Sequence, residues 1–154
     1  MRIWQLIASD HVGNMAGKAA ALSGGRWNHR GVPAIYTCRS PALCALEAIT
    51  TITTAVTEQP VMFLVEMIAP DDTELYWQPD RSKLPKDWEA IPQRQPAREF
   101  GSAFLKANDR LGLIVPSAIM PLEDKIVINP RHPAMKKITI VKTYEYRRGE
   151  RMFN

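Results

Sequence analysis

The apolar residues of the chain fall into short runs separated by polar stretches, and most of these runs have the length of a β-strand. They are rich in β-branched and aromatic residues, which favour strands. Strands are therefore expected over residues 3–7, 34–38, 61–68, 113–120, 126–128 and 138–146. In the second of these, the two-residue period of a strand places Tyr36 and Cys38 on the same face.

Two further segments have the pattern of helices. The first has Ser40 as its N-cap and Pro41 at its first helical position, and it is expected to end near Val56. The threonines in its later part are poor helix formers, so the sequence defines this end less sharply than the start. The second begins at Pro96 and carries apolar residues three and four apart as far as Leu111, which gives it one apolar face.

Polar segments rich in glycine or proline connect these elements. Residues 11–31 are expected to form a loop with one helical turn at 15–22, and residues 70–95 a surface segment. Strands outnumber helices, and the two do not alternate regularly, so the sequence predicts an α+β fold. With neither an internal repeat nor a linker, residues 1–154 are expected to form a single compact domain.

The composition is that of an ordinary globular protein, with 154 residues and 45% hydrophobic content. The two cysteines, Cys38 and Cys44, form no CxxC pair and the three histidines are scattered, so neither a disulfide framework nor a metal is expected. The N-terminal apolar run is short and Asp10 follows soon after it, so a signal peptide is not expected. Residues 41–56 are too short and polar to span a bilayer, so a soluble, cytoplasmic protein is expected.

Positive charge is concentrated at the C-terminal end. Residues 131–154 hold seven lysines and arginines against Glu145 and Glu150, whereas the first 130 residues carry 13 basic and 14 acidic groups. This segment is either a solvated strand with a charged terminus or a surface for an anionic ligand or partner. Because no helix-turn-helix, RRM or KH pattern accompanies it, direct nucleic-acid binding is not expected.

Glu47 is the one charged residue of an otherwise apolar helical segment, residues 42–49. A helix that is apolar nearly all round is buried, and a buried carboxylate must be paired or hydrogen-bonded. Glu47 is therefore either the structural partner of an arginine or a catalytic carboxylate.

Three other residues could serve a ligand. Arg26 follows Gly24 and Gly25, so its guanidinium could contact a phosphate where the glycines let the backbone approach, or it could be a solvated turn residue. Tyr36 either offers a flat face to a planar ring or fills the core. Ser117 lies in an apolar stretch, where its hydroxyl needs a partner, without the GxSxG pattern of a nucleophile.

These residues occur in one order together with several short motifs. The motifs are GGRWN at 24–28, SPALCALE at 40–47, VPSA at 115–118 and IVINPRHP at 126–133. Their combination, with Tyr36 ten residues after Arg26, resembles the RES-domain toxins of RES/Xre toxin–antitoxin pairs. The resemblance covers nearly the whole chain, and the family is named for an arginine, a glutamate and a serine, which match Arg26, Glu47 and Ser117.

The resemblance implies a fold like that of ADP-ribosyltransferase toxins, with a mixed sheet, flanking helices and a cleft for NAD. It implies three catalytic residues: Arg26 to bind the dinucleotide phosphates, Tyr36 to stack on the nicotinamide ring, and Glu47 to face the nicotinamide ribose. Trp27 and Asn28 either touch the ligand or brace the loop. The expected NAD-binding residues of the pocket are Gly25, Trp27, Asn28 and Ser117.

The chemistry of NAD cleavage suits a single carboxylate. Breaking the nicotinamide–ribose bond builds positive charge on the sugar, which a fixed carboxylate stabilises, and the neutral leaving group needs no general acid.

Two positions depart from the pattern that the resemblance implies. Gln5 follows Trp4 where an arginine is usual, and Lys125 stands where an asparagine is common, so affinity or acceptor choice could differ.

The leading expectation is a toxin that depletes NAD+, as a hydrolase or phosphorylase, and is neutralised by an Xre-type helix-turn-helix antitoxin. An ADP-ribosyltransferase that modifies a cellular protein would share the same pocket and stays open. The third alternative is a non-catalytic binding module that uses the basic C-terminal segment. The expected partners are NAD+, inorganic phosphate and the antitoxin, with a homodimer left open and no membrane contact expected.

Overall fold

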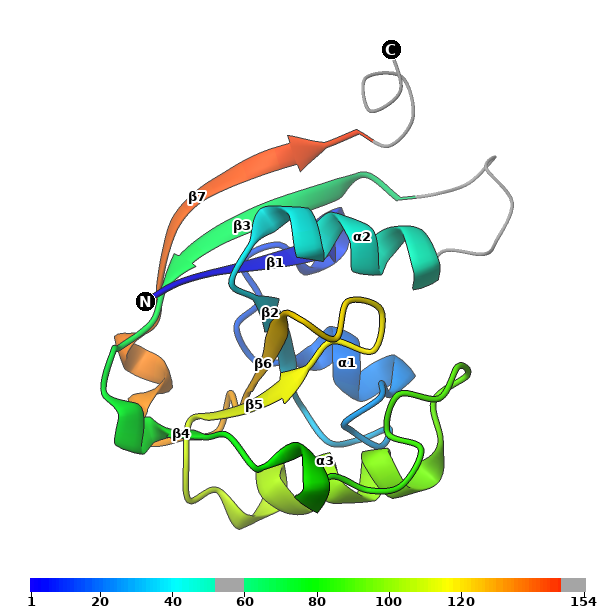
Figure 1. Cartoon of the computed structure of the whole chain (residues 1–154). Helices are drawn as coiled ribbons and strands as arrows, with labels where there is room; N and C mark the ends of the chain where they lie inside the picture. The colour runs from blue at the N-terminus through cyan, green and yellow to red at the C-terminus, as the bar shows by residue number, and fades with distance from the viewer. Residues whose placement is uncertain (52–59, 148–154) are drawn as a thin grey trace.

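Seven strands form one sheet in the computed structural model, which describes residues 1–51 and 60–147 (Figure 1). In chain order the strands are β1 (Arg2–Ala8), β2 (Ile35–Cys38), β3 (Met62–Ile68), β4 (Tyr76–Trp77), β5 (Gly112–Pro116), β6 (Asp124–Ile128) and β7 (Thr139–Tyr146). They lie in the order β4-β5-β6-β2-β1-β3-β7. β4 and β5 are parallel and the other neighbours antiparallel, so the sheet is mixed.

Helices flank this sheet, which confirms the predicted α+β class. In the part of the chain that the structure describes, the α-helices are α1 (Lys18–Ser23), α2 (Pro41–Thr51) and α3 (Gln95–Ala107). α2 packs on β1 and β2, and α3 lies beside β4 and β5 (Figure 1). Ser40 is the N-cap of α2, as predicted, because its hydroxyl accepts the Leu43 N–H at 3.0 Å. No helix within residues 1–51 and 60–147 has the length and apolarity needed to cross a membrane.

The second predicted helix ends earlier than its apolar pattern indicates. α3 stops at Ala107 because Asn108 adopts a left-handed conformation with φ of 58°, where its N–H bonds to Phe104 O. Leu111 continues the three-and-four spacing in the sequence, but it precedes β5 and packs in a different cluster from Phe104. The prediction of Leu111 as a helical residue is therefore wrong.

The predicted end of one strand also differs from the structure. The strand expected over residues 113–120 ends at Pro116, because the Ser117 hydroxyl accepts the N–H groups of Ile119 and Met120 and turns the chain. In addition, β4 lies inside residues 70–95, where a surface segment and no strand was predicted. The expected end of the first helix near Val56 lies outside the described residues.

The core lies on both faces of the sheet. On β6, Val127 packs under α3, while its neighbours Ile126 and Ile128 belong to the opposite cluster, as the two-residue period of a strand requires. Under α2, Leu43 packs in a smaller cluster that includes both cysteines, which are buried free thiols. The sheet is thus covered around its middle, where β1, β2 and β6 meet.

The far edge of the sheet is different, because β7 is exposed along almost all of its length. Of the basic C-terminal residues, Lys142 projects from this strand, and its ammonium lies 4.9 Å from the ring centroid of Tyr144. Arg148 and Arg151 lie outside the described residues. An anionic ligand or partner for this segment stays a prediction.

Candidate active site

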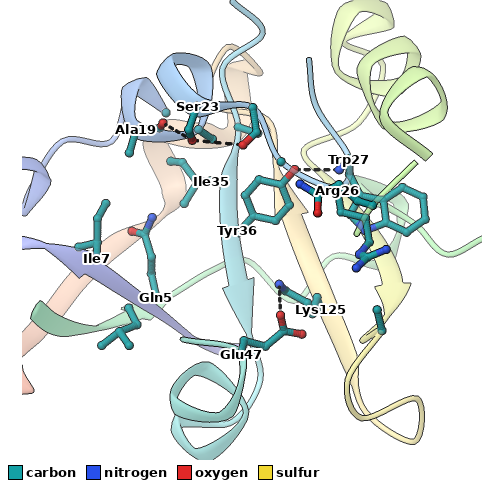
Figure 2. Close-up of a pocket in the computed structure, with 18 of the residues that line it drawn as sticks. Gln5, Ile7, Ala19, Ser23, Arg26, Trp27, Ile35, Tyr36, Glu47 and Lys125 are labelled. Atoms are coloured by element: carbon teal, nitrogen blue, oxygen red, sulfur yellow. Dashed lines mark hydrogen bonds and ion pairs between the residues drawn. The ribbon is translucent and has the colours of Figure 1, made fainter. Parts of the chain in front are cut away.

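A cavity of about 810 Å³ opens beside the middle of the sheet (Figure 2). Residues of β1, α1, β2, α2, β5 and β6 line it together with residues of the connecting loops, and its volume is in the range of small-molecule sites. Asn28 and Ser117 lie behind its wall, each fully buried. The other predicted site residues line the cavity itself: Gly25, Arg26, Trp27, Tyr36 and Glu47.

The loop at residues 24–28 is held by hydrogen bonds within the protein. The Asn28 amide donates to Ala20 O and Val32 O at 2.9 Å each, and its oxygen accepts the Tyr36 hydroxyl at 2.6 Å. The same hydroxyl accepts the Trp27 N–H at 3.0 Å. The structure therefore gives Asn28 a bracing position, and direct contact of its side chain with a ligand stays a prediction.

Gly25 provides space for Tyr36. A Cβ at Gly25 would lie 2.6 Å from the Tyr36 hydroxyl oxygen and 2.9 Å from Asn28 Oδ1, which is closer than real Cβ contacts. Burial raises the pKa of Tyr36 above its ordinary value, so the hydroxyl stays neutral and can donate to Asn28. The missing side chain at Gly25 thus lets the tyrosine join the loop.

Trp27 fills the space between this loop and α3. Its side chain is buried, with ring centroids at 6.0 Å from Phe100 and 6.4 Å from Trp88. These contacts hold the Trp27 side chain against Trp88 and α3.

Arg26 connects the cavity to residues 88–90, which directly precede the cavity-lining residues 91–93. Its Nη1 donates to the carbonyl oxygens of Trp88 and Ala90, both at 2.7 Å. Burial lowers the pKa of the Arg26 guanidinium, while the negative charge of Glu47 opposes that shift. The guanidinium therefore lies in the electrostatic field of Glu47 and also holds one rim of the cavity.

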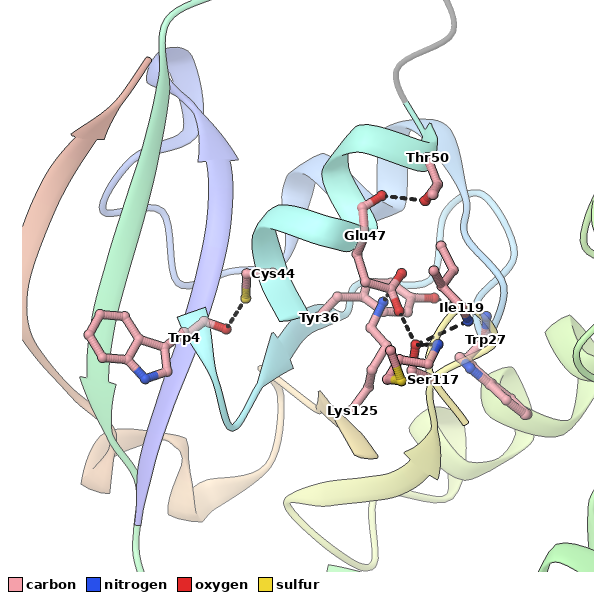
Figure 3. A network of polar contacts seen from close by, with 10 residues as sticks. Trp4, Trp27, Tyr36, Cys44, Glu47, Thr50, Ser117, Ile119 and Lys125 are labelled. Atoms are coloured by element: carbon pink, nitrogen blue, oxygen red, sulfur yellow. Dashed lines mark hydrogen bonds and ion pairs between the residues drawn. The ribbon is translucent and has the colours of Figure 1, made fainter. Parts of the chain in front are cut away.

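Glu47 projects from α2 into the cavity and is anchored on both oxygens (Figure 3). The Ser117 hydroxyl donates to Oε1 at 2.7 Å, and Lys125 Nζ lies 3.0 Å from Oε2. The side chains of Glu47 and Lys125 are only 18% and 17% exposed. Since Ser117 also accepts two backbone N–H groups, it connects the carboxylate to the rigid turn after β5.

Lys125 also lines the cavity, and the sequence alone assigned it no role in the site. It lies on β6, and its ammonium is 3.0 Å from Glu47 and 5.4 Å from the centroid of the Tyr36 ring. In the sequence it is a charge directly before the apolar run of a strand, at a position where an asparagine is common in the pattern that the chain resembles. Gln5, the other departure noted in the sequence, also lines the cavity (Figure 2).

The sequence model of the RES domain family matches residues 2–149. The chain belongs to the RES domain family. This RES domain is 33% identical over 141 residues to the "Prs ADP-ribosylating toxin" of Sphingobium sp. (strain YBL2), an alignment that covers 90% of the chain and 86% of the relative. It is 30% identical over 138 residues to "Toxin Res" of Yersinia enterocolitica, with 88% of each chain covered.

The fold of the RES domain also matches a solved structure. A chain from the crystal structure of the M. tuberculosis MbcT–MbcA toxin–antitoxin complex superposes with a TM-score of 0.71 at 18% sequence identity. The match covers 94% of the RES domain and 83% of that chain. At this identity the similarity establishes the common fold.

The charged groups that line the cavity of the RES domain are mostly cationic. Among the lining residues that the structure describes, Lys18, Arg26 and Lys125 accompany a single carboxylate, Glu47. Such a cavity favours an anionic ligand that places a positive or electron-poor group near the one carboxylate. Within residues 1–51 and 60–147, no three histidine, cysteine, aspartate or glutamate side chains gather as a metal-binding group.

Proposed function

We propose that this RES domain is the toxin of a toxin–antitoxin system and that it consumes NAD+ by cleaving the nicotinamide–ribose bond. The observation that supports this most strongly is Glu47, a carboxylate held by Ser117 in the same cavity as Arg26 and the Tyr36 ring. The names of the relatives, which include "Prs ADP-ribosylating toxin" and "Toxin Res", support both the toxin role and NAD as the substrate.

In the proposed reaction, the bond between C1 of the ribose and the nicotinamide nitrogen breaks, and its electron pair leaves with neutral nicotinamide. The cationic sugar that develops is stabilised by Glu47, whose partly buried carboxylate is already oriented by Ser117. Water or inorganic phosphate then bonds to C1, and for water a proton is released. The resulting product is ADP-ribose or its 1-phosphate.

Arg26 is proposed to bind the diphosphate of NAD+. A guanidinium has five N–H donors, so it can contact a phosphate while Nη1 still holds the carbonyl oxygens of Trp88 and Ala90. This arrangement would couple the ligand to the loop that forms the cavity rim. The contribution of Arg26 is therefore orientation of the dinucleotide.

A protein acceptor is the alternative for the same site. It is favoured by the relative that is named for ADP-ribosylation of Prs, which aligns with 90% of the chain. Labelled NAD+ added to a cell extract distinguishes the two reactions, because transfer to a protein leaves the label in a protein band, whereas hydrolysis and phosphorolysis leave it in small products.

The proposal is tested by mixing the purified protein with NAD+ and measuring nicotinamide with no added acceptor, with phosphate and with cell extract. We expect nicotinamide release under at least one of these conditions. Absence of release under all three would contradict NAD+ cleavage. An Xre-type helix-turn-helix antitoxin, the proposed partner, should suppress the release when it is added in equal amount.

A further inference from the structure

The ammonium of Lys125 occupies a position where a ligand cation would be well bound. It lies 3.0 Å from Glu47 Oε2 and 5.4 Å from the centroid of the Tyr36 ring, inside the wall of the cavity (Figure 2). A carboxylate and the face of an aromatic ring both attract positive charge, and more strongly where water is largely excluded. The two groups therefore form the walls of a small cation site that Lys125 fills.

The carboxylate does not depend on Lys125 for its orientation. Ser117 donates to the other oxygen of Glu47 at 2.7 Å, and Ser117 is itself fixed by the N–H groups of Ile119 and Met120. Lys125, in contrast, carries its charge at the end of a flexible four-carbon chain. The ammonium can therefore move away while Glu47 stays in place.

We propose that Glu47, Ser117 and the Tyr36 ring form a cation subsite and that Lys125 is its internal ligand, which a cationic group must displace to enter. This inference deepens the proposed function, because the nicotinamide ring of NAD+ and the developing ribose cation both carry positive charge. While Lys125 is in place, its charge offsets the carboxylate that would stabilise them. Lys125 thus lowers both the affinity of the site for a cation and its activity.

A purely structural lysine would behave in the opposite way. If Lys125 only supported Glu47, its removal would weaken every property that depends on the carboxylate. If Lys125 competes with a ligand cation, its removal should strengthen cation binding and leave the binding of neutral molecules unchanged.

The test uses two probes that share a ring and differ in charge: 1-methylnicotinamide, a cation, and nicotinamide, which is neutral. Their affinities are measured by calorimetry for the wild type, Lys125→Met, which removes the charge, and Lys125→Arg, which keeps it. We expect Lys125→Met to bind 1-methylnicotinamide on the order of tenfold more tightly than the wild type, with nicotinamide changed less than about twofold. Lys125→Arg should resemble the wild type.

Two results would overturn the inference: unchanged or weaker 1-methylnicotinamide binding by Lys125→Met, or an equal gain for both probes. A thermal melt checks that each variant is folded, and Lys125→Gln replaces Lys125→Met if the latter does not fold. In the double variant Glu47→Gln/Lys125→Met the gain in affinity for the cation should disappear, because the carboxylate that binds it is gone.

A kinetic measurement separates this inference from the proposed function. Lys125→Met should release nicotinamide from NAD+ with a higher kcat/KM than the wild type. If neither protein releases nicotinamide but Lys125→Met still gains affinity for the cation, the proposed reaction is wrong and the cation subsite stands. If the wild type releases nicotinamide and Lys125→Met shows no gain in cation affinity, the subsite is wrong and the reaction stands.

Discussion

The two walls of the cavity are built in different ways. The wall at residues 24–28 is held by hydrogen bonds among its own groups. The Asn28 amide bonds to the nearby backbone and to the Tyr36 hydroxyl, and that hydroxyl in turn accepts the Trp27 N–H. The opposite wall carries Glu47, whose carboxylate is held on one side by a buried serine and on the other by a lysine that can move. The first wall gives the cavity its shape, and the second brings negative charge to it.

This difference shows that the motif residues of one cavity need not share one task. Gly25, Trp27 and Asn28 occupy positions that build the wall, so substitutions there should act mainly on folding. Substitutions at Glu47 should act mainly on chemistry, because its carboxylate lines the cavity and a glutamine in its place can still accept the Ser117 hydroxyl. Variants in the two walls should therefore differ in how far they lower stability and how far they lower nicotinamide release, and the largest loss of stability is expected at Asn28.

Asn28→Ala should destabilise the protein by about 3 kcal/mol, since the fully buried side chain loses its hydrogen bonds to Ala20 O, His29 O and Val32 O and the acceptor of the Tyr36 hydroxyl. Urea unfolding measures this change. Asn14→Ala, which removes an exposed bond to the Ala16 N–H, serves as the control and should cost under about 1 kcal/mol. Equal losses for the two variants would mean that the first wall is not the rigid one.

Gly25→Ala should destabilise the protein by about 2 kcal/mol and lower nicotinamide release, because the new Cβ displaces the Tyr36 hydroxyl. Gly31→Ala is the control: its φ of +87° strains an alanine, but no atom lies within 4 Å of the added Cβ. It should lose stability without losing activity per folded molecule. A fully active Gly25→Ala would show that the position of Tyr36 is unimportant.

Ser117→Ala should lower nicotinamide release about tenfold, because Glu47 loses the hydrogen bond that orients it, and should cost about 1–2 kcal/mol of stability. Ser102→Ala is a matched control, since Ser102 is also buried and its hydroxyl accepts the His29 N–H at 2.9 Å. The control should lose similar stability and keep its activity. If both variants release nicotinamide at the same rate, Ser117 has no role in positioning Glu47.

Tyr36→Phe should have the smallest effect, about 1 kcal/mol near neutral pH, because the ring remains and only the hydroxyl is lost. Burial raises the pKa of Tyr36 in the folded protein above its ordinary value of 10, so folding favours the neutral phenol. Its contribution to stability is therefore present below about pH 10 and is lost as the pH rises further. The difference in unfolding free energy between wild type and variant should shrink above pH 10, and a constant difference would contradict this.

Much of the fold follows from local patterns. The apolar runs around Ile3, Val65 and Val127 predict β1, β3 and β6, and Ser40 with Pro41 predicts the start of α2. β4 could not be predicted in this way, because a two-residue strand exists only through its pairing with β5. The end of α3 depends on the left-handed conformation of Asn108, which the continued apolar spacing to Leu111 conceals.

The sequence predicted which residues belong to the site better than it predicted the contacts between them. The order of Arg26, Tyr36 and Glu47 in the sequence is enough to nominate them, and all three line one cavity. That Lys125 pairs with Glu47, 78 residues away, depends on the pairing of β2 with β6. Likewise, the space that Gly25 leaves for Tyr36 appears only once β2 is placed against the loop.

The dependence of NAD+ cleavage on the negative charge of Glu47 is what the proposed function requires above all. It is tested most directly by comparing nicotinamide release by the wild type and Glu47→Gln, an uncharged side chain of the same shape, at equal concentrations of folded protein. We expect release per folded molecule to fall by roughly 10²–10³-fold, because the uncharged amide no longer stabilises the developing ribose cation. Release by Glu47→Gln at the wild-type rate would contradict it.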